Sequence, residues 1–509
     1  MTDSPTYAHR AVKGYLLVLI FTVLAGLAGY LFRVILARQL STVEFGLFFA
    51  IFTFYWLLEY FRSWGLASAL AKFIPEFLAK NEHLKIDNAF KLVTGFHLVT
   101  GILLGIFFFF TAGFFARHYF HNQTAVLAIQ VFAVAFVMRG VKDDLRLFFQ
   151  GFQDMFWYAV IYFLENSFLL LVVLPLLLVT KTALAPVLAY VIVFTLITIL
   201  SAFVMLRKRN PFKTKFSYSP RLVRQLWSYG FALMLGGLAS MVYLYTDTLI
   251  LTYFRSLSEV GVYGATVTIG MTLTFLTTPL VAVLYPMMSE LWAGKKRSLL
   301  RENHNRASTY MLAIVLLPAL VVFAFPEPIL RLLFGEEYVA GAFTLRILIL
   351  ATLFLVLATF QLNTLNATGH AKVARNLGVA VALLNLVANL LFIPSYGMVA
   401  AAATTFASYF TLFVASTFTL RSRLGFKTPW LRWLRCTLAG AVGLATLLLA
   451  KFVIGGPLWV HVGVPVLFGG LAYAFALFLF HGLTRDDWQF FLTHFPFARR
   501  LAFWQNEAF

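Results

Sequence analysis

The chain has 509 residues, of which 61% are hydrophobic and only 12% are charged. Soluble globular domains carry about a quarter charged residues, so this composition excludes an ordinary water-soluble protein. The formal net charge of +20 would suit nucleic acid, but Lys- and Arg-rich cytoplasmic loops of a membrane protein explain it more simply. We therefore expect no nucleic-acid partner. The single cysteine, Cys436, excludes an intrachain disulfide and a thiolate metal cluster.

Apolar runs of about 20 residues recur from end to end, and each is long enough to cross a bilayer. They predict an all-α polytopic membrane protein with about fourteen transmembrane helices. The predicted spans are 13–35, 43–71, 90–115, 123–149, 155–180, 184–206, 228–254, 260–286, 306–325, 338–367, 373–394, 398–420, 432–453 and 458–481. The first apolar run is longer than the core of a secretory signal, which favours an uncleaved first span.

The distribution of basic residues predicts the orientation of the chain. With a cytoplasmic N-terminus, the inside segments hold 31 Lys and Arg residues and the outside segments hold six. Cytoplasmic loops are enriched in these residues, so we expect a multi-pass protein of the cell membrane with both termini in the cytoplasm. The inside group includes Arg139, Lys142 and Arg146, which we place at the cytoplasmic edge of the fourth span.

An internal repeat divides the sequence. STVEFGLFFA (41–50) resembles SLSEVGVYGA (256–265), which aligns Glu44-Phe45-Gly46 with Glu259-Val260-Gly261. Chance similarity between apolar segments is the alternative explanation. A duplicated six-span unit would place the two halves around a shared site.

We predict three parts, joined at a basic linker over 207–224. They are an N-lobe with spans one to six (1–210), a C-lobe with spans seven to twelve (211–424), and spans thirteen and fourteen with an amphipathic tail (425–509). Residues 220–227 and 484–509 mix aromatic or apolar residues with arginine, which is typical of helices that lie on the membrane surface.

Motifs for enzymatic chemistry are absent from the sequence. It contains no phosphate-cradling Gly-rich loop with Lys-Ser/Thr, no HExxH and no Cys/His cluster. We therefore predict no catalytic residue, no metal site and no cofactor, and the protein is not expected to be an enzyme. The pairs Asp143-Asp144 and Asp486-Asp487 could belong to a metal-dependent sugar transferase, but their basic neighbours favour solvated charge. Short external loops argue against a membrane-embedded glycan polymerase or ligase.

Ionisable side chains at membrane depth are costly and should face a partner or a wet cavity. Arg33, Arg62 and Arg346 are the candidate ligands for an anionic headgroup, because the guanidinium fork matches phosphate. Arg346 is the strongest of the three, since its own span offers no acidic residue at helical spacing. Arg33 could instead snorkel outward to lipid phosphate.

Three carboxylates are candidate coupling or gating residues, namely Glu59, Glu165 and Asp247. Glu59 precedes Arg62 by three residues, so a structural ion pair on one helix face is an equally good explanation. For Asp247, capping of a helix end or a pair between the halves is the alternative. His97, in the third span, is more typical of a satisfied polar group than of a proton relay.

Three stretches resemble the polysaccharide flippases of the multidrug/oligosaccharidyl-lipid/polysaccharide (MOP) superfamily. They are ARQLSTVEFGLFFA (37–50), TDTLILTYFRSLSEVGVYGA (246–265) and NATGHAKVARNLGVAVALLNLVANLLFIPSYGMVAAAATTFASYF (366–410). The third carries the family's pair of asparagines, here Asn385 and Asn389, and its Ile-Pro-x-x-Gly turn. The resemblance covers about residues 10–420.

The resemblance implies two pseudo-symmetric six-helix bundles around a central cavity. The implied cargo is a polyprenyl-phosphate- or diphosphate-linked oligosaccharide that crosses by alternating access, driven by H+, Na+ or the membrane potential. Membrane lipids and a glycan polymerase or other glycan-assembly membrane proteins are the implied partners.

Two other functions stay open at this point. A cation or drug exporter of the same superfamily would need clustered acidic residues. A lipid II flippase would match Arg33 and Arg62 by span, but the eighth span here has no basic residue.

Overall fold

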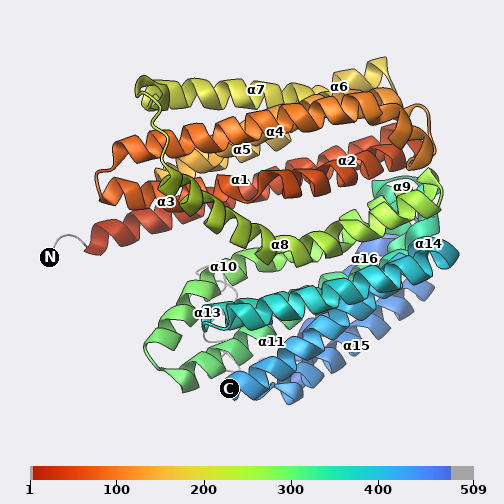
Figure 1. Ribbon diagram of the computed structural model, residues 1–509. Helices are drawn as coiled ribbons and strands as arrows, with labels where there is room; N and C mark the ends of the chain where they lie inside the picture. The colour runs from red at the N-terminus through yellow and green to blue at the C-terminus, as the bar shows by residue number, and fades with distance from the viewer. Residues whose placement is uncertain (1–3, 483–509) are drawn as a thin grey trace. The chain divides into compact units, whose positions relative to one another are not determined.

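The computed structural model describes residues 4–482, so the predicted tail helix at 484–509 and Asp486-Asp487 lie outside the described residues. Within that range every regular element is helical and no strand occurs, as predicted (Figure 1). The elements are α1 (Ser4–Gln39), α2 (Thr42–Ser63), α3 (Leu66–Ala79), α4 (His83–His118), α5 (Ala125–Gly151), α6 (Met155–Val179), α7 (Leu184–Lys208), η1 (Pro211–Lys213), α8 (Pro220–Phe254), α9 (Leu257–Gly270), α10 (Thr272–Ala293), α11 (Arg297–Ala324), α12 (Pro326–Leu333), η2 (Glu336–Gly341), α13 (Ala342–Ala367), α14 (Ala371–Leu424), α15 (Trp430–Val453) and α16 (Leu458–Leu479).

Thirteen helical segments of the described chain are long and apolar enough to cross a membrane. The difference from the predicted fourteen lies in α14, which runs for 54 residues and contains the spans predicted at 373–394 and 398–420. Its helical geometry is broken at Gly397, where φ is 59° and ψ is −139°. Glycine adopts a positive φ at little cost, so two spans meet at this residue.

Two predicted spans are interrupted in the structure. The span expected at 43–71 ends with α2, because Trp64 and Gly65 both adopt left-handed backbone conformations before α3 begins. A Cβ on Gly65 would lie 2.4 Å from the Gly230 carbonyl oxygen, so this turn also requires glycine for close approach. The span expected at 260–286 is divided between α9 and α10. The surface helix expected at 220–227 forms the first turns of α8 and is continuous with the span.

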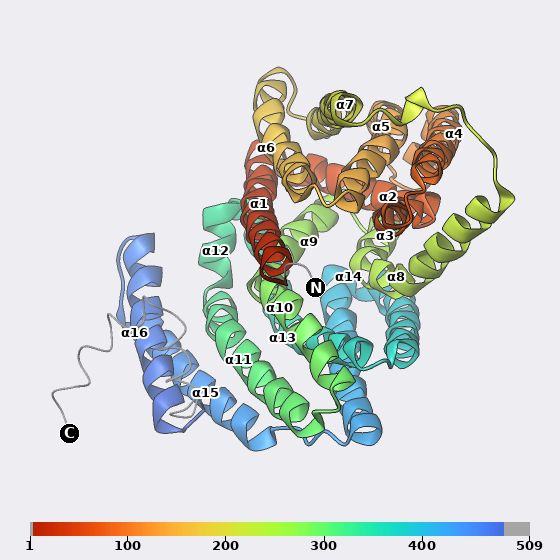
Figure 2. The ribbon, with the colours of Figure 1, turned by 90° about the vertical axis from the view of Figure 1, so that its left-hand side faces the viewer.

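The chain forms two compact units. The first unit comprises Met1–Thr268, Leu330–Thr344 and Gly378–Thr404, and the second comprises Ile269–Ile329, Leu345–Leu377 and the chain from Thr405 onward. The division at 210 and 424 stays a prediction. In the first unit α4, α5, α6 and α7 lie side by side and pack with α1 and α2 (Figures 1 and 2).

Aromatic packing fixes α2 against α5 in the first unit. The Tyr55 ring stacks on Phe132 with centroids 4.2 Å apart, and its hydroxyl donates to the Ala135 carbonyl oxygen at 3.0 Å. A buried tyrosine with a satisfied hydroxyl contributes apolar area without an unpaired polar group. This contact sets the register that brings the polar residues of the two helices together.

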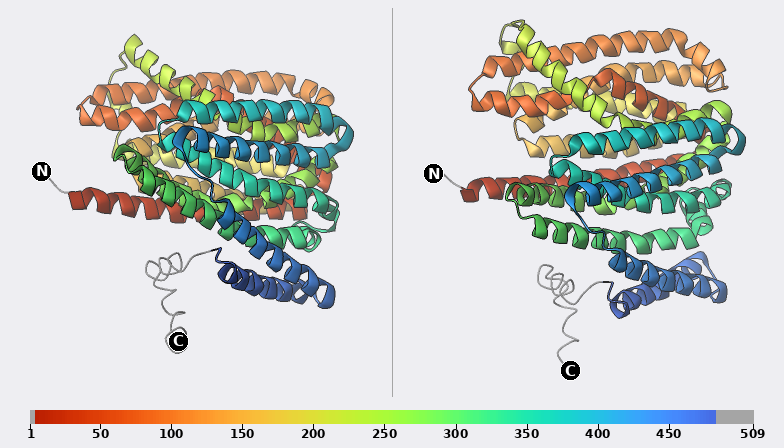
Figure 3. Two further views of the ribbon diagram at one scale, coloured as in Figure 1. Left: turned by 90° about the horizontal axis from the view of Figure 1, so that it is seen from below. Right: turned by 60° about the horizontal axis from the view of Figure 1, so that its bottom comes forward.

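In the second unit α15 packs against both α11 and α16, and the two blue helices lie side by side in both views of Figure 3. A Cβ on Gly440 of α15 would lie 2.6 Å from the Leu316 side chain of α11. The Tyr473 hydroxyl of α16 donates to the Ala313 carbonyl oxygen at 2.9 Å. Small residues allow such close helix contacts within a bilayer.

Candidate functional site

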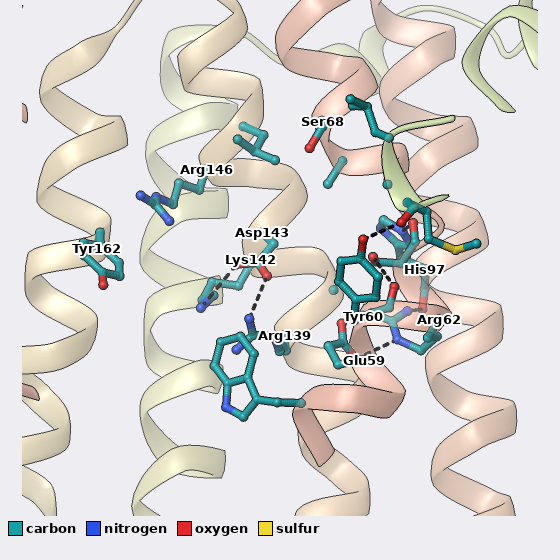
Figure 4. Close-up of a pocket in the computed structure, with 18 of the residues that line it drawn as sticks. Glu59, Tyr60, Arg62, Ser68, His97, Arg139, Lys142, Asp143, Arg146 and Tyr162 are labelled. Carbon is teal, nitrogen blue, oxygen red and sulfur yellow. Dashed lines mark hydrogen bonds and ion pairs between the residues drawn. The ribbon is translucent and has the colours of Figure 1, made fainter. Parts of the chain in front are cut away.

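A charged cavity of about 460 Å³ lies within the first unit (Figure 4). Its walls come from α2 to α6 and α8, together with the turn between α2 and α3. Lining residues with ionisable side chains are Glu59, Arg62, His97, Arg139, Lys142, Asp143, Arg146 and Glu165. Four of these side chains are Arg or Lys cations and three are carboxylates, so these seven groups have a net charge of +1.

Helix α5 supplies most of the positive charge. Arg139, Lys142 and Arg146 are spaced by three and four residues, which places them along one helix face (Figure 4). Their predicted position at the cytoplasmic edge of the fourth span stays a prediction. They belong to α5 itself, and Lys142 is only 2% exposed. The spacing of the three basic residues in the sequence predicts that they share a helix face, but it cannot predict which residues of other helices they contact.

Lys142 bridges α5 and α6. Its Nζ lies 2.6 Å from Glu165 Oε2 and 3.3 Å from Asp143 Oδ1. Glu165, predicted as a coupling or gating residue, is therefore brought into the cavity wall as a counter-charge. A buried lysine needs such a partner, because an unpaired charge at this depth is very costly.

Arg139 has donors that no described group satisfies. Its Nη2 is 3.5 Å from Asp143 Oδ2, and its guanidinium lies 3.3 Å from the centroid of the Trp56 ring. Its Nε and Nη1, and the indole Nε1 of Trp56, are buried without a hydrogen-bond partner among residues 4–482. Buried donors are nearly always paired, so we expect a water or ligand oxygen to approach this group.

Two aromatic rings hold Arg146 in this wall. It stacks on Tyr158 and Tyr162, at 4.5 and 4.6 Å from their ring centroids, and its Nε donates to the Tyr158 carbonyl oxygen at 3.2 Å. Within the described chain no carboxylate lies within ion-pair distance of it. The aromatic rings hold the guanidinium in place while leaving its charge available to a ligand.

Glu59 and Arg62 form the ion pair that their spacing suggested, and both also line the cavity. The Arg62 Nε donates to Glu59 Oε2 at 2.8 Å, and its Nη2 donates to Oε1. The remaining Nη1 donates to the His97 carbonyl oxygen at 2.9 Å. The structural and the cavity-lining interpretations of this pair therefore both hold.

His97 is held by two oxygen atoms. Its Nδ1 lies 2.8 Å from Asp144 Oδ1, and its Nε2 lies 3.1 Å from the Ser63 carbonyl oxygen. Asp144 is 0% exposed, so the expectation of solvated charge at this position is wrong. The close packing of α5 against α4 removes the carboxylate from water.

The two other predicted arginines lie outside this cavity wall. Arg33, in α1, is half-buried, and its Nη1 is 3.5 Å from Thr268 Oγ1. Arg346, in α13 of the second unit, has a partner from another helix that the sequence did not reveal. Its Nη2 donates to Glu327 Oε1 of α12 at 2.8 Å, and its Nε donates to the Phe323 carbonyl oxygen.

Asp247 belongs to a separate buried polar cluster of the first unit. Its Oδ2 accepts from the Tyr263 hydroxyl at 2.8 Å, and its Oδ1 accepts from Asn389 Nδ2 at 2.7 Å. Asn389 Nδ2 also donates to Asn385 Oδ1 at 3.1 Å, and Asn389 Oδ1 accepts from the Thr404 hydroxyl. Asp247 therefore connects α8 and α9 to α14 through the asparagine pair of the family resemblance.

Sequence comparison identifies the family. The profile of the polysaccharide biosynthesis protein family matches residues 11–292, which is more than half of the chain. The chain belongs to this family. The MatE family profile matches residues 232–391, which agrees with the MOP superfamily assignment made from the motifs.

Individual relatives support the same assignment along nearly the whole chain. An uncharacterized membrane protein of Methanocaldococcus jannaschii is 28% identical over 88% of this chain and 91% of its own length. A probable low-salt glycan biosynthesis flippase of Haloferax volcanii is 24% identical over 86% of this chain and 89% of its own length.

Among solved structures, the lipid II flippase MurJ in its inward closed conformation is similar in fold. The TM-score is 0.72 at 15% sequence identity, over 92% of this chain and 99% of MurJ. Taken with the family and the relatives, this likeness establishes a multi-pass membrane protein of the MOP superfamily with a flippase-type transporter fold.

Proposed function

We propose that the protein moves a polyprenyl-phosphate- or diphosphate-linked oligosaccharide across the cell membrane by alternating access, for the synthesis of surface glycans. The observation that carries the proposal is the cationic surplus of the cavity, where Arg146 lacks a carboxylate partner among the described residues and Arg139 has unused donors. The Haloferax volcanii relative, a probable glycan biosynthesis flippase, supports the same class of cargo.

The cavity offers what a phosphorylated headgroup requires. A diphosphate cannot cross hydrocarbon without a polar path, and arginine binds its oxygens through a planar, charge-assisted fork. The volume of about 460 Å³ falls within the usual range of ligand pockets, about 300–1,000 Å³. The prenyl chain would remain in the lipid, whose components are the other molecular partners we propose.

The carboxylates act as resting counter-charges in this proposal. Glu59 holds Arg62 and Glu165 holds Lys142 while the cavity lacks cargo, and the incoming phosphate competes for both cations. Asp247 serves as a gating residue that ties α8 to α14. Arg33 and Arg346 lie outside this wall, and we propose that they also bind the cargo. Glu327 pairs with Arg346 while no cargo is bound.

Two alternatives have specific support. The MatE match over 232–391 favours an ion-coupled cation or drug exporter, whereas the net positive wall opposes cationic cargo. The similarity of the fold to MurJ favours a lipid II flippase. Against it, the basic residues of this cavity come from α2 and α5, and none comes from α9 or α10, which contain the eighth predicted span. Glycan-assembly membrane proteins are the partners that the glycan cargo would require.

Binding measurements on the purified full-length protein test this proposal. A polyprenyl-diphosphate saccharide and a lipophilic cation are compared at two salt concentrations. We expect tighter binding of the diphosphate lipid, weakened by salt because the contacts are ionic. Preference for the cation would overturn the proposal in favour of the exporter.

A matched pair of arginine variants locates the binding site. Arg146→Ala should weaken diphosphate-lipid binding by about ten- to hundredfold, since a hydrogen bond to a charged group contributes about 1.5–3 kcal/mol. Arg207→Ala is the control, because Arg207 likewise stacks on an aromatic ring, that of Phe203 at 4.4 Å, but lies outside the cavity wall. Equal effects of the two substitutions would remove Arg146 from the site.

A further inference from the structure

His97 and Asp144 form a buried pair at the edge of the cavity. The His97 side chain contributes to the wall and is labelled in Figure 4, yet it is only 1% exposed, and Asp144 behind it is fully buried. The Asp144 Oδ1 lies 2.8 Å from His97 Nδ1, whereas its Oδ2 has no hydrogen-bond partner among residues 4–482. Asp144 therefore depends on His97 for its polar contacts.

The hydrogen-bond geometry requires an extra proton on this pair. Both ring nitrogens of His97 face oxygen atoms, the Asp144 carboxylate at 2.8 Å and the Ser63 carbonyl at 3.1 Å. A neutral imidazole has one N–H, so one of the two contacts would join two acceptors. Only an imidazolium, or a neutral ring beside a protonated Asp144, satisfies both. The pair therefore holds one proton more than a neutral histidine beside a carboxylate.

The surrounding charges lead to the same conclusion. The charged groups that face the pair are Arg62 and Glu59 from α2 and Asp143 from α5. Arg62 and Glu59 neutralise each other, and Asp143 is held by Arg139 and Lys142. The buried group of His97, Asp144, Arg62 and Glu59 is thus neutral with the extra proton and carries −1 without it. A buried unpaired charge is costly, so the site has a strong affinity for one proton.

We propose that His97 and Asp144 are the proton-binding site of this transporter, and that the proton bound there is linked to binding of the anionic headgroup in the cavity. This inference rests on the proposed function and identifies its coupling ion. The connection is Arg62, which lines the cavity and donates to the His97 carbonyl oxygen at 2.9 Å. Loss of the proton leaves a negative charge beside Arg62, which repels an anion. Proton and headgroup therefore bind cooperatively, and the coupling is reciprocal.

The test uses the full-length protein in lipid nanodiscs, with farnesyl diphosphate as the anionic probe and farnesol as the uncharged reference. Calorimetry in two buffers of different ionisation enthalpy measures the protons taken up on binding. We expect uptake of up to one proton for each diphosphate bound, and affinity that falls by at most about tenfold per pH unit as the pH rises. Diphosphate binding without proton uptake at any pH would overturn the proposal.

Three variants assign the effect to the pair. His97→Gln and Asp144→Asn should remove the proton uptake and make diphosphate binding independent of pH over the same range. His304→Gln is the control, because His304 is also buried but is held by Thr364 Oγ1 at 3.0 Å and stacks on Phe360. It should behave as the wild type. Unchanged proton uptake in both pair variants would contradict the assignment.

Titration of the ligand-free protein separates the two ways in which the experiment can fail. Infrared difference spectra between pH values should contain imidazole or carboxyl signals that disappear in His97→Gln. If the wild type binds no diphosphate but shows these signals, the proposed function fails while the proton site stands. If the wild type binds diphosphate but lacks the signals, the proton site fails while the proposed function stands.

Discussion

Gly46 of α2 and Gly261 of α9 lie in backbone contact within the first unit. A Cβ added to Gly46 would lie 1.8 Å from the Leu257 carbonyl oxygen and 2.8 Å from the Gly261 nitrogen, and one added to Gly261 would lie 2.2 Å from the Thr42 carbonyl oxygen. These are corresponding positions of the two sequence repeats. The repeats therefore meet at their shared Glu-x-Gly motif, where only glycine permits this approach.

Substitution of either glycine should destabilise the protein. Gly46→Ala and Gly261→Ala force the two helices apart, and overpacking of this kind costs about 1–3 kcal/mol. Thermal unfolding in detergent, followed by tryptophan fluorescence, should show a clear drop in the midpoint. Gly95→Ala is the control, since nothing lies within 4 Å of the Cβ it would add in α4. Equal midpoints for all three variants would contradict the contact.

The two motif glutamates make equivalent hydrogen bonds to backbone. Glu44 Oε2 accepts from the Ala183 amide at 2.7 Å, and Glu259 Oε1 accepts from the Met398 amide at 2.7 Å. Each carboxylate thereby stabilises a turn before a later helical segment. Glu259 Oε2 also accepts from Arg255 Nε at 2.9 Å, so Glu259 has the larger set of partners.

Truncation of these glutamates should therefore lower stability in a fixed order. We expect Glu44→Ala to cost about 1.5–3 kcal/mol, the value of a charge-assisted hydrogen bond, and Glu259→Ala to cost more. Glu302→Ala, which breaks an exposed pair with Arg306, should cost under about 1 kcal/mol. Thermal unfolding checks the order, and a larger effect at Glu302 than at either motif glutamate would refute it.

The ion pair of Lys142 and Glu165 should show strong non-additivity. Lys142→Met leaves a buried carboxylate without its cation, which typically costs about 3–5 kcal/mol. Adding Glu165→Gln removes that charge, so the double variant should recover much of the lost stability. Thermal unfolding of the single and double variants measures the difference.

An exposed pair provides the reference for this cycle. Lys80→Met breaks the ion pair with Glu76, in which the two side chains are 58% and 39% exposed, and should leave the midpoint almost unchanged. If the double variant of the buried pair is no more stable than Lys142→Met alone, the charge argument is wrong.

Gly397 provides a test of the break in α14. Its φ of 59° disfavours any side chain, and a Cβ there would lie 1.9 Å from Glu259 Oε1. Gly397→Ala should therefore lower the unfolding midpoint more than Gly425→Ala, where φ is 64° but nothing lies within 4 Å. Both substitutions strain the backbone, so the difference between their midpoints measures the steric clash with Glu259 at Gly397. Equal midpoints would contradict this clash.

Much of the fold could be predicted from the sequence, because apolar runs of membrane length report helices directly. The breaks were harder to locate. Gly397 separates two predicted spans as expected, yet Trp64-Gly65 and the step between α9 and α10 interrupt runs that look continuous. Hydropathy averages over such turns, whereas the left-handed conformation of one or two residues decides them.

The candidate site was only partly predictable. Arg62, Glu59 and Glu165 were identified as costly charges at membrane depth, and all three line the cavity. Lys142 and Asp144 were missed, because their position at the end of an apolar run resembles a cytoplasmic edge. Their burial depends on Glu165 and His97, which are 23 and 47 residues away in the sequence. Such partners become visible only when the helices are packed.

Translocation in proteoliposomes tests the central claim most directly. A fluorescent polyprenyl-diphosphate saccharide is reconstituted with the full-length protein, and its appearance in the opposite leaflet is followed for wild type, Arg146→Ala and the control Arg207→Ala. We predict protein-dependent translocation that Arg146→Ala abolishes and Arg207→Ala retains. Translocation that is equal in all three proteins, or no faster than in protein-free vesicles, would contradict an anionic lipid-linked cargo bound in this cavity.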